Sequence, residues 1–138
     1  MRGPYGRFNS SPPGDAKQVW VAGGIGVTPF LSMIRAMQPG DPREVHFVYA
    51  ARSRNEALFL DELVTRVEKT PNVTLHTLFS DEGEFARIDA ARQRLPDSLT
   101  QYEYFMCGPR PMVAALMRGL RSEGVRRSQI HTEAFEFR

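Results

Sequence analysis

The sequence has few of the features that mark several classes of protein. It contains one cysteine, so no disulfide can form within the chain and nothing points to an oxidising compartment. No apolar run approaches the roughly 18 residues of a membrane-spanning helix, and the N-terminal segment lacks the apolar core of a signal peptide. The net charge of +2 is too small to indicate nucleic-acid binding.

The chain has the length and composition of one soluble globular domain. Its 138 residues, 41% of them hydrophobic and 25% charged, are enough to bury a substantial core. The first 15 residues differ, because they are rich in glycine, proline and serine and resemble a linker. We expect residues 1–15 to be the end of a preceding domain plus a linker, or else a disordered arm, and residues 16–138 to be the folded domain.

Predicted strands and helices alternate along the chain. The strands are expected at residues 19–22, 45–50, 73–79, 102–107 and 130–137, and the helices at residues 28–38, 55–69, 88–95 and 111–122. Such alternation is typical of a parallel sheet covered on both faces, with right-handed crossovers. The predicted fold is α/β, a doubly wound, Rossmann-like, five-stranded parallel sheet with the strand order 3-2-1-4-5.

A glycine turn joins the first strand to the first helix. Thr28 is a suitable N-cap and Pro29 suits the first helical position, while the glycines allow a ligand to approach the backbone closely. Together with the helix N-terminus, this turn predicts a diphosphate site, the alternative being an ordinary strand-to-helix turn. Gly26→Val is then expected to abolish binding without disturbing the fold. The candidate residues of this turn are Gly23, Gly24, Ile25, Gly26, Val27, Thr28 and Pro29.

A second glycine-containing loop follows the fourth strand. Cys107, Gly108, Pro109 and Arg110 lead into the last helix, and Pro111 opens it. In the predicted strand order this loop faces the first one across the crevice where the order reverses, which is where open α/β sheets bind their ligands. The pair of loops predicts a dinucleotide site.

Several motifs resemble the NAD(P)-binding domain of the ferredoxin–NADP reductase superfamily, which includes flavoprotein and ferric-reductase-like proteins. The resemblance spans almost the whole chain in the family's order, and its most specific part is the Cys-Gly-Pro-x-x-Met element with the closing Glu-x-Phe. The matching segments are Gly-Pro-Tyr-Gly at 3–6, Ala-Gly-Gly-Ile-Gly-Val-Thr-Pro at 22–29, Tyr-Ala-Ala-Arg at 49–52, Met-Cys-Gly-Pro-Arg-Pro-Met at 106–112 and His-Thr-Glu-Ala-Phe at 131–135.

The resemblance implies hydride transfer from NAD(P)H to FAD held on a separate domain of the same parent protein. The nicotinamide is expected near Thr28, Cys107 and Gly108, with Met112 in the same motif, and Glu133 and Phe135 close to nicotinamide and flavin. Thr28, Cys107, Glu133 and Phe135 are therefore the candidate catalytic residues. Catalysis is then positioning of the two rings rather than acid–base chemistry. The family's flavin-binding element is absent, so the chain alone is expected to be inactive.

The choice between NADP and NAD depends on the ends of the second and third strands. Dinucleotide sites that take NAD place an acid after the second strand to bind the ribose 2′-OH. This chain has Arg52, Ser53 and Arg54 there, which favours a 2′-phosphate and hence NADPH. Ser80 and Arg87 after the third strand suit the same phosphate, whereas Asp81 and Glu82 oppose it, so NADH stays open.

The parent protein and the electron acceptor are left open by the sequence. The resemblance is consistent with a ferric-reductase-like membrane protein or with a soluble reductase, and in either case with a cytoplasmic location. A non-catalytic nucleotide-sensing module of the same fold is the alternative function. No metal site is expected, because His46, His76 and His131 are scattered along three predicted strands.

Overall fold

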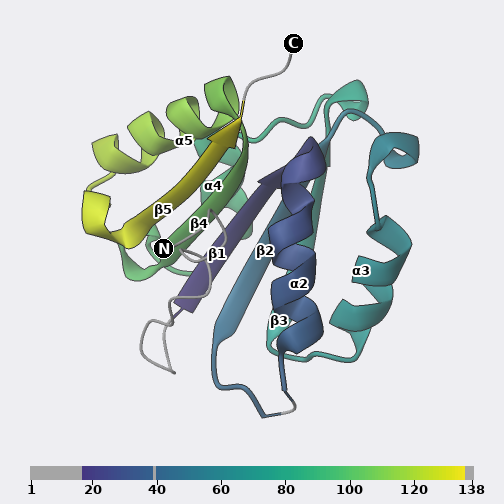
Figure 1. The fold of residues 1–138 in the computed structure, drawn as a ribbon. Coiled ribbons are helices and arrows are strands. Elements are labelled where there is room, and N and C mark those ends of the chain that lie inside the picture. The colour runs from purple at the N-terminus through teal and green to yellow at the C-terminus, as the bar shows by residue number, and fades with distance from the viewer. Residues whose placement is uncertain (1–16, 39, 136–138) are drawn as a thin grey trace, which may run out of the picture.

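A computed structural model of the chain describes residues 17–38 and 40–135, so the predictions for residues 1–16 lie outside its described part (Figure 1). The fold is a five-stranded sheet in which every paired strand is parallel, with the order β3-β2-β1-β4-β5. This confirms the predicted architecture and strand order. The strands are β1 (Lys17–Gly23), β2 (Glu44–Ala51), β3 (Val73–Phe79), β4 (Glu103–Pro109) and β5 (Ile130–Phe135).

Within the described residues, four α-helices cover the sheet, two on each face. Helices α2 and α3 lie on one face, and α4 and α5 lie on the other (Figure 1). None of the helices in the described ranges is long and apolar enough to span a bilayer. The helices are α2 (Thr28–Ala36), α3 (Leu60–Glu68), α4 (Ile88–Arg94) and α5 (Arg110–Ser122).

The core consists of two apolar layers separated by the sheet. Successive side chains of a strand point to opposite faces, so a strand covered on both sides is apolar throughout. In β1, Trp20 packs in the α2–α3 layer, and Val19 and Val21 pack in the α4–α5 layer. Trp20 is fully buried, and its ring centroid lies 5.8 Å from that of Phe30 and 5.7 Å from that of Phe47. This aromatic cluster holds α2 against β1 and β2.

The connection between β2 and α3 differs from the predicted continuous helix 55–69. Residues Arg54–Glu56 form a single 3-10 turn, and α3 begins only at Leu60. Phe59 interrupts the helix because its φ of 60° lies in the left-handed region, which bulky residues rarely adopt. Leu58, which lies within the predicted helix, is 45% exposed, and its carbonyl accepts a hydrogen bond from Tyr49 Oη at 3.0 Å. The first helix is also shorter than predicted, since it ends at Ala36.

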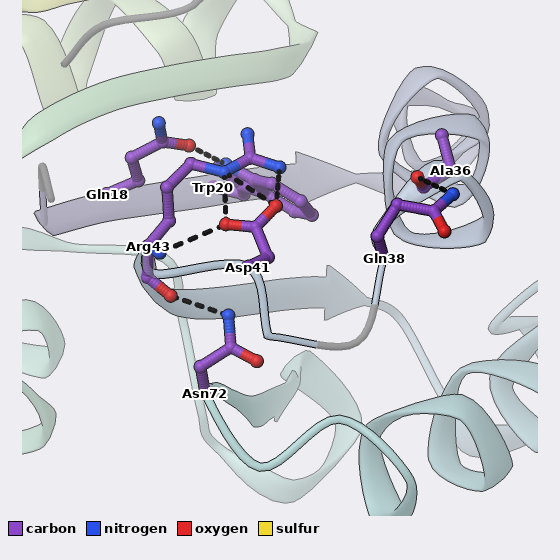
Figure 2. A network of polar contacts seen from close by, with 7 residues as sticks. All are labelled: Gln18, Trp20, Ala36, Gln38, Asp41, Arg43 and Asn72. Atoms are coloured by element: carbon purple, nitrogen blue, oxygen red, sulfur yellow. Dashed lines mark hydrogen bonds and ion pairs between the residues drawn. The ribbon is translucent and has the colours of Figure 1, made fainter. Parts of the chain in front are cut away.

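The amino ends of the strands are joined by polar contacts, shown in Figure 2. The Arg43 guanidinium donates to both carboxylate oxygens of Asp41, which lowers the pKa of that carboxyl. Asn72 Nδ2 donates to the Arg43 carbonyl at 2.6 Å and so ties the α2–β2 connection to the α3–β3 connection. On β1, Trp20 Nε1 donates to Gln18 Oε1 at 2.9 Å. These contacts fix the edge of the sheet opposite the predicted ligand site.

The aromatic cluster supports a stability prediction. Phe47→Ala, at a fully buried position, is expected to lower the free energy of unfolding by about 3–5 kcal/mol through lost burial and a cavity. The matched control is Phe85→Ala, at a position 44% exposed, which should change it by less than about 1 kcal/mol. Urea unfolding followed by circular dichroism measures both, and equal losses would contradict the assigned core.

Candidate functional site

The glycine turn after β1 forms as a 3-10 turn, Gly24–Val27, that continues directly into α2. Gly24 has a φ of 57°, and a Cβ there would meet no atom within 4 Å, so this position faces open space. Ile25 is 55% exposed. No side chain caps the start of the turn or of α2, and the backbone N–H of Thr28 donates to the Ile25 carbonyl within the turn. The positive end of the helix dipole favours an anion at this position.

Thr28 does not cap α2 as predicted. It is the first residue of the helix, the N-cap is Val27, and Pro29 therefore takes the second helical position. The Thr28 hydroxyl donates to the Ile25 carbonyl at 3.3 Å, because the preceding 3-10 turn already gives Thr28 a helical backbone. The side chain of Thr28 is exposed beside the turn, at the position where the sequence predicts a catalytic role.

The turn packs directly against the backbone at the tip of β4. Gly26 is buried, and a Cβ at this position would lie 2.6 Å from the carbonyl carbon of Cys107 and would overlap its oxygen. The two predicted loops therefore meet, as the dinucleotide hypothesis requires. The same contact corrects the expectation that Gly26→Val would spare the fold, since the added side chain would enter β4 rather than the ligand's space.

A second pair of glycines faces the side chain of Met112. A Cβ on Gly23 would lie 2.7 Å from Met112 Sδ, and a Cβ on Gly108 would lie 2.5 Å from Met112 Cε. Met112 thus covers the adjacent ends of β1 and β4, and both glycines are needed to make room for it. The sequence predicted Met112 as a cofactor-binding residue, and the structure gives it a packing role that its position in the motif did not reveal.

The predicted loop after β4 is shorter than expected. Strand β4 continues through Gly108 to Pro109, and α5 begins at the next residue, Arg110. No side chain caps α5 either, so a second helix N-terminus opens at the same edge as that of α2. Arg110 is exposed in the first turn of α5 and engages in contacts of its own.

Cys107 is buried beside Glu133 and Phe135. It pairs in register with Glu133 on β5, and Pro109 pairs with Phe135, which packs against the same apolar layer as Cys107. Cys107 is only 4% exposed, and burial raises the pKa of its thiol to about 11, with a further contribution from the Glu133 carboxylate. The thiol is therefore neutral at physiological pH, and of the described helices none lies over β4 and β5 on this face (Figure 1).

The remaining predicted site residues lie at the ends of β2 and β3. Arg52 directly follows β2, and its carbonyl accepts a hydrogen bond from the Asp81 N–H at 2.9 Å, which joins the two loops. Ser53 caps the following 3-10 turn by accepting from the Glu56 N–H. Ser80 begins a 3-10 turn after β3, and Arg87 is the N-cap residue of α4. Arg54 belongs to the turn that Ser53 caps.

The histidines are less scattered than expected. His46 Nδ1 lies 3.2 Å from His76 Nε2, and His46 Nε2 lies 3.0 Å from a Glu44 oxygen. Burial, with His46 and Arg94 nearby, lowers the pKa of His76 to about 4, so His76 is neutral at physiological pH. Residues 17–38 and 40–135 contain no group of three or more potential metal ligands.

All predicted site residues of the described chain thus lie near the carboxyl ends of the parallel strands. The glycine turn sits where the strand order reverses, between β1 and β4. This arrangement defines the class of open α/β domains that bind ligands at this edge of the sheet.

Comparisons with known proteins identify the family. Residues 20–118 match the family model described as the oxidoreductase NAD-binding domain. The flavohemoprotein of Rhodopirellula baltica is 33% identical over 96% of this chain and 35% of its own length. The reductase component of propane 2-monooxygenase from Rhodococcus jostii is 29% identical over 98% of this chain and 40% of its own length. The crystal structure of a Malassezia yamatoensis flavohemoglobin with bound FAD and heme has a TM-score of 0.80 at 24% identity, over 94% of this chain and 34% of that one.

The chain belongs to the oxidoreductase NAD-binding domain family, within the ferredoxin–NADP reductase superfamily that its motifs resemble. It is an NAD-binding domain of the kind found in flavin-dependent reductases. The chain spans between 35% and 40% of the length of the two curated relatives above.

The contact between Gly26 and β4 supports a second stability prediction. Gly26→Val is expected to lower the free energy of unfolding by about 3 kcal/mol or more, because the clash is with backbone. The control is Gly24→Asn, in open space at a φ that asparagine tolerates, which should cost less than about 1 kcal/mol. Thermal and urea unfolding test the difference, and a stable Gly26→Val variant would disprove the close packing.

The buried thiol supports a pH prediction. Because the pKa rises from 9.0 to about 11 on folding, the native protein holds about 100-fold less thiolate at pH 8 than the unfolded chain. Folding favours the neutral thiol, so the associated stability is present below pH 9 and is lost as the pH rises towards 11. Alkylation by iodoacetamide should be at least 100-fold slower in the native state than in urea. Equal rates would contradict the burial, and the single cysteine makes the assignment unambiguous.

Proposed function

We propose that this chain holds NAD(P)H so that its nicotinamide transfers hydride to FAD on a separate domain of the same parent protein. The observation that carries the proposal is the contact of the glycine turn with the tip of β4, which brings two uncapped helix N-termini to one edge. The diphosphate lies on residues 24–28, where Gly24 faces open space. The positive dipole end of the helix that begins at this turn suits its charge.

The nicotinamide lies beside Thr28, Cys107 and Gly108. Thr28 offers an exposed hydroxyl and Cys107 a small neutral thiol, so a flat ring can approach the strand end closely. A hydride acceptor such as the flavin ring supplies the redox chemistry when its domain is present. Glu133 and Phe135 on β5 border this position, on the part of the sheet face that no described helix covers (Figure 1).

The protein's contribution is positioning. The thiol of Cys107 is neutral and buried, so it is not set up to act as an acid, base or nucleophile in the transfer. Hydride transfer needs donor and acceptor atoms within about 3–3.5 Å of each other. The shape of the nicotinamide site and the docked flavin domain would set this distance. The adenosine end extends towards Arg52, Ser53, Arg54, Ser80 and Arg87. The parent would be a ferric-reductase-like or ferredoxin-reductase-like electron-transfer protein.

A charge at Ile25 tests the diphosphate site. Ile25→Glu places a carboxylate at the exposed tip of the turn and should weaken NADH binding about tenfold or more, by like-charge repulsion. Ile25→Gln has the same shape without the charge and should bind within about threefold of wild type. Calorimetric titration with NADH and with 5′-AMP measures both variants. Equal effects of the two substitutions on NADH affinity would contradict the placement of the diphosphate at this turn. Wild-type protein that binds 5′-AMP as tightly as NADH would favour a nucleotide-sensing module instead.

A further inference from the structure

The loops after β2 and β3 form one continuous surface at the adenosine end of the site. The hydrogen bond from the Asp81 N–H to the Arg52 carbonyl joins their backbones at 2.9 Å. Gly83 follows in the left-handed conformation with a φ of 80° and turns the chain back, so that the Glu84 N–H donates to the Phe79 carbonyl at 3.1 Å. The side chains of these two loops therefore share one small rim of the sheet.

Two of the three arginines predicted to bind a 2′-phosphate, Arg52 and Arg54, already have carboxylate partners. Arg54 Nε lies 3.3 Å from Glu82 Oε2, and the Arg54 guanidinium stacks 4.7 Å above the ring of Phe79, which is only 1% exposed. Arg52 Nε lies 3.7 Å from Glu56 Oε2, one helical turn further along the chain. Arg54 is thus held from two sides, by an ion pair and by a buried ring.

The charges of this rim balance. Its cations are Arg52, Arg54 and Arg87, and its carboxylates are Glu56, Asp81 and Glu82. The neighbouring Glu84 is paired with Arg94 at 3.4 Å and so adds no free charge. The rim therefore has no surplus of positive charge for a phosphomonoester, which carries between 1.5 and 2 negative charges, as a rough value at pH 7.

We propose that Glu82, assisted by Glu56, makes the site select the dinucleotide without a 2′-phosphate, which is NADH. This proposal rests on the proposed function, since it concerns the adenosine end of the same site. The end of the second strand is where open α/β domains meet the ribose 2′ position. The pair with Glu82 uses Arg54 Nε, so a 2′-phosphate that binds the remaining donors of this guanidinium brings a dianion beside the Glu82 carboxylate, which repels it. A 2′-OH instead donates a hydrogen bond to the carboxylate and leaves the ion pair in place.

The two ion pairs differ in importance. The side chain of Arg52 is 80% exposed, and its pair with Glu56 is long, so solvent and salt weaken it. The pair of Arg54 with Glu82 is shorter, and the stacking on Phe79 restricts the guanidinium further. Glu82 is therefore the main specificity-determining residue, and Glu56 has the smaller effect.

The test uses two adenosine nucleotides that differ only in the 2′-phosphate. Calorimetric titration of the full 138-residue chain with 5′-AMP and with adenosine 2′,5′-bisphosphate gives the ratio of the two affinities. The wild-type chain should favour 5′-AMP. Glu82→Gln should raise the affinity for the bisphosphate about fivefold, the upper range for an exposed ion pair, and change that for 5′-AMP less than twofold. Glu56→Gln should act in the same direction with a smaller effect.

Asp81→Asn is the matched control, because it removes the same charge from the same loop and Asp81 has no ion pair with a described residue. An equal gain in Asp81→Asn and Glu82→Gln would mean that general charge and not the Arg54 pair sets the preference, which overturns the proposal. A lower bisphosphate affinity in Glu82→Gln would also overturn it, because Glu82 would then position Arg54 for the phosphate. Binding of both nucleotides with an unchanged ratio refutes this inference alone. Failure of both to bind refutes the proposed function and this inference with it.

Discussion

The close packing of a glycine turn against a strand end governs this site. Gly26 lies so near the backbone of Cys107 that no side chain fits between them. That contact sets the distance between the start of α2 and the tip of β4. It also determines that two helix N-termini open at one edge of the sheet, where a diphosphate needs them. The glycines after β1 therefore serve the fold first, and only Gly24 faces space that a ligand could fill.

The two ends of the site differ in how they handle charge. At the glycine turn the positive potential comes from backbone dipoles, and the nearby Cys107 thiol is kept neutral by burial. At the ends of β2 and β3 the positive potential comes from arginines. Two of them, Arg52 and Arg54, already form ion pairs with carboxylates within 4 Å. In the proposed site, a cofactor that spans both ends would meet an electropositive helix start at its diphosphate and a surface of balanced charge at its adenosine.

The sequence predicted the fold well because β1, β2 and β4 are largely apolar and the turns carry glycine or proline. The strand order and the edge of the site followed from the alternation of elements and from the two glycine-containing loops. The start of α3 did not follow, because Phe59 adopts a left-handed backbone that its residue type does not favour, so no local signal marks the break. The sequence also could not show what lies where a Cβ of Gly26 would be, since a glycine can make room either for a ligand or for another part of the protein.

The sequence also did not predict which side chains from different loops contact one another. Met112 was recognised as part of a motif, but its place over Gly23 and Gly108 depends on how β1 and β4 pair. The partner of Arg52 was visible in principle, because Glu56 follows at the spacing of one helical turn. The partner of Arg54 was not, because Glu82 is 28 positions away along the chain and reaches it only through the pairing of β2 with β3.

The exposure of the Arg54–Glu82 pair has a consequence for how this domain can diverge. Changes at Gly26 are coupled to folding, so few of them can survive. Changes at the ion pair involve side chains that are 66% and 45% exposed, which surface substitutions alter at little cost in stability. Under the proposed function, the preference between the two nicotinamide cofactors could therefore be changed without altering the turn that would hold the diphosphate of either one.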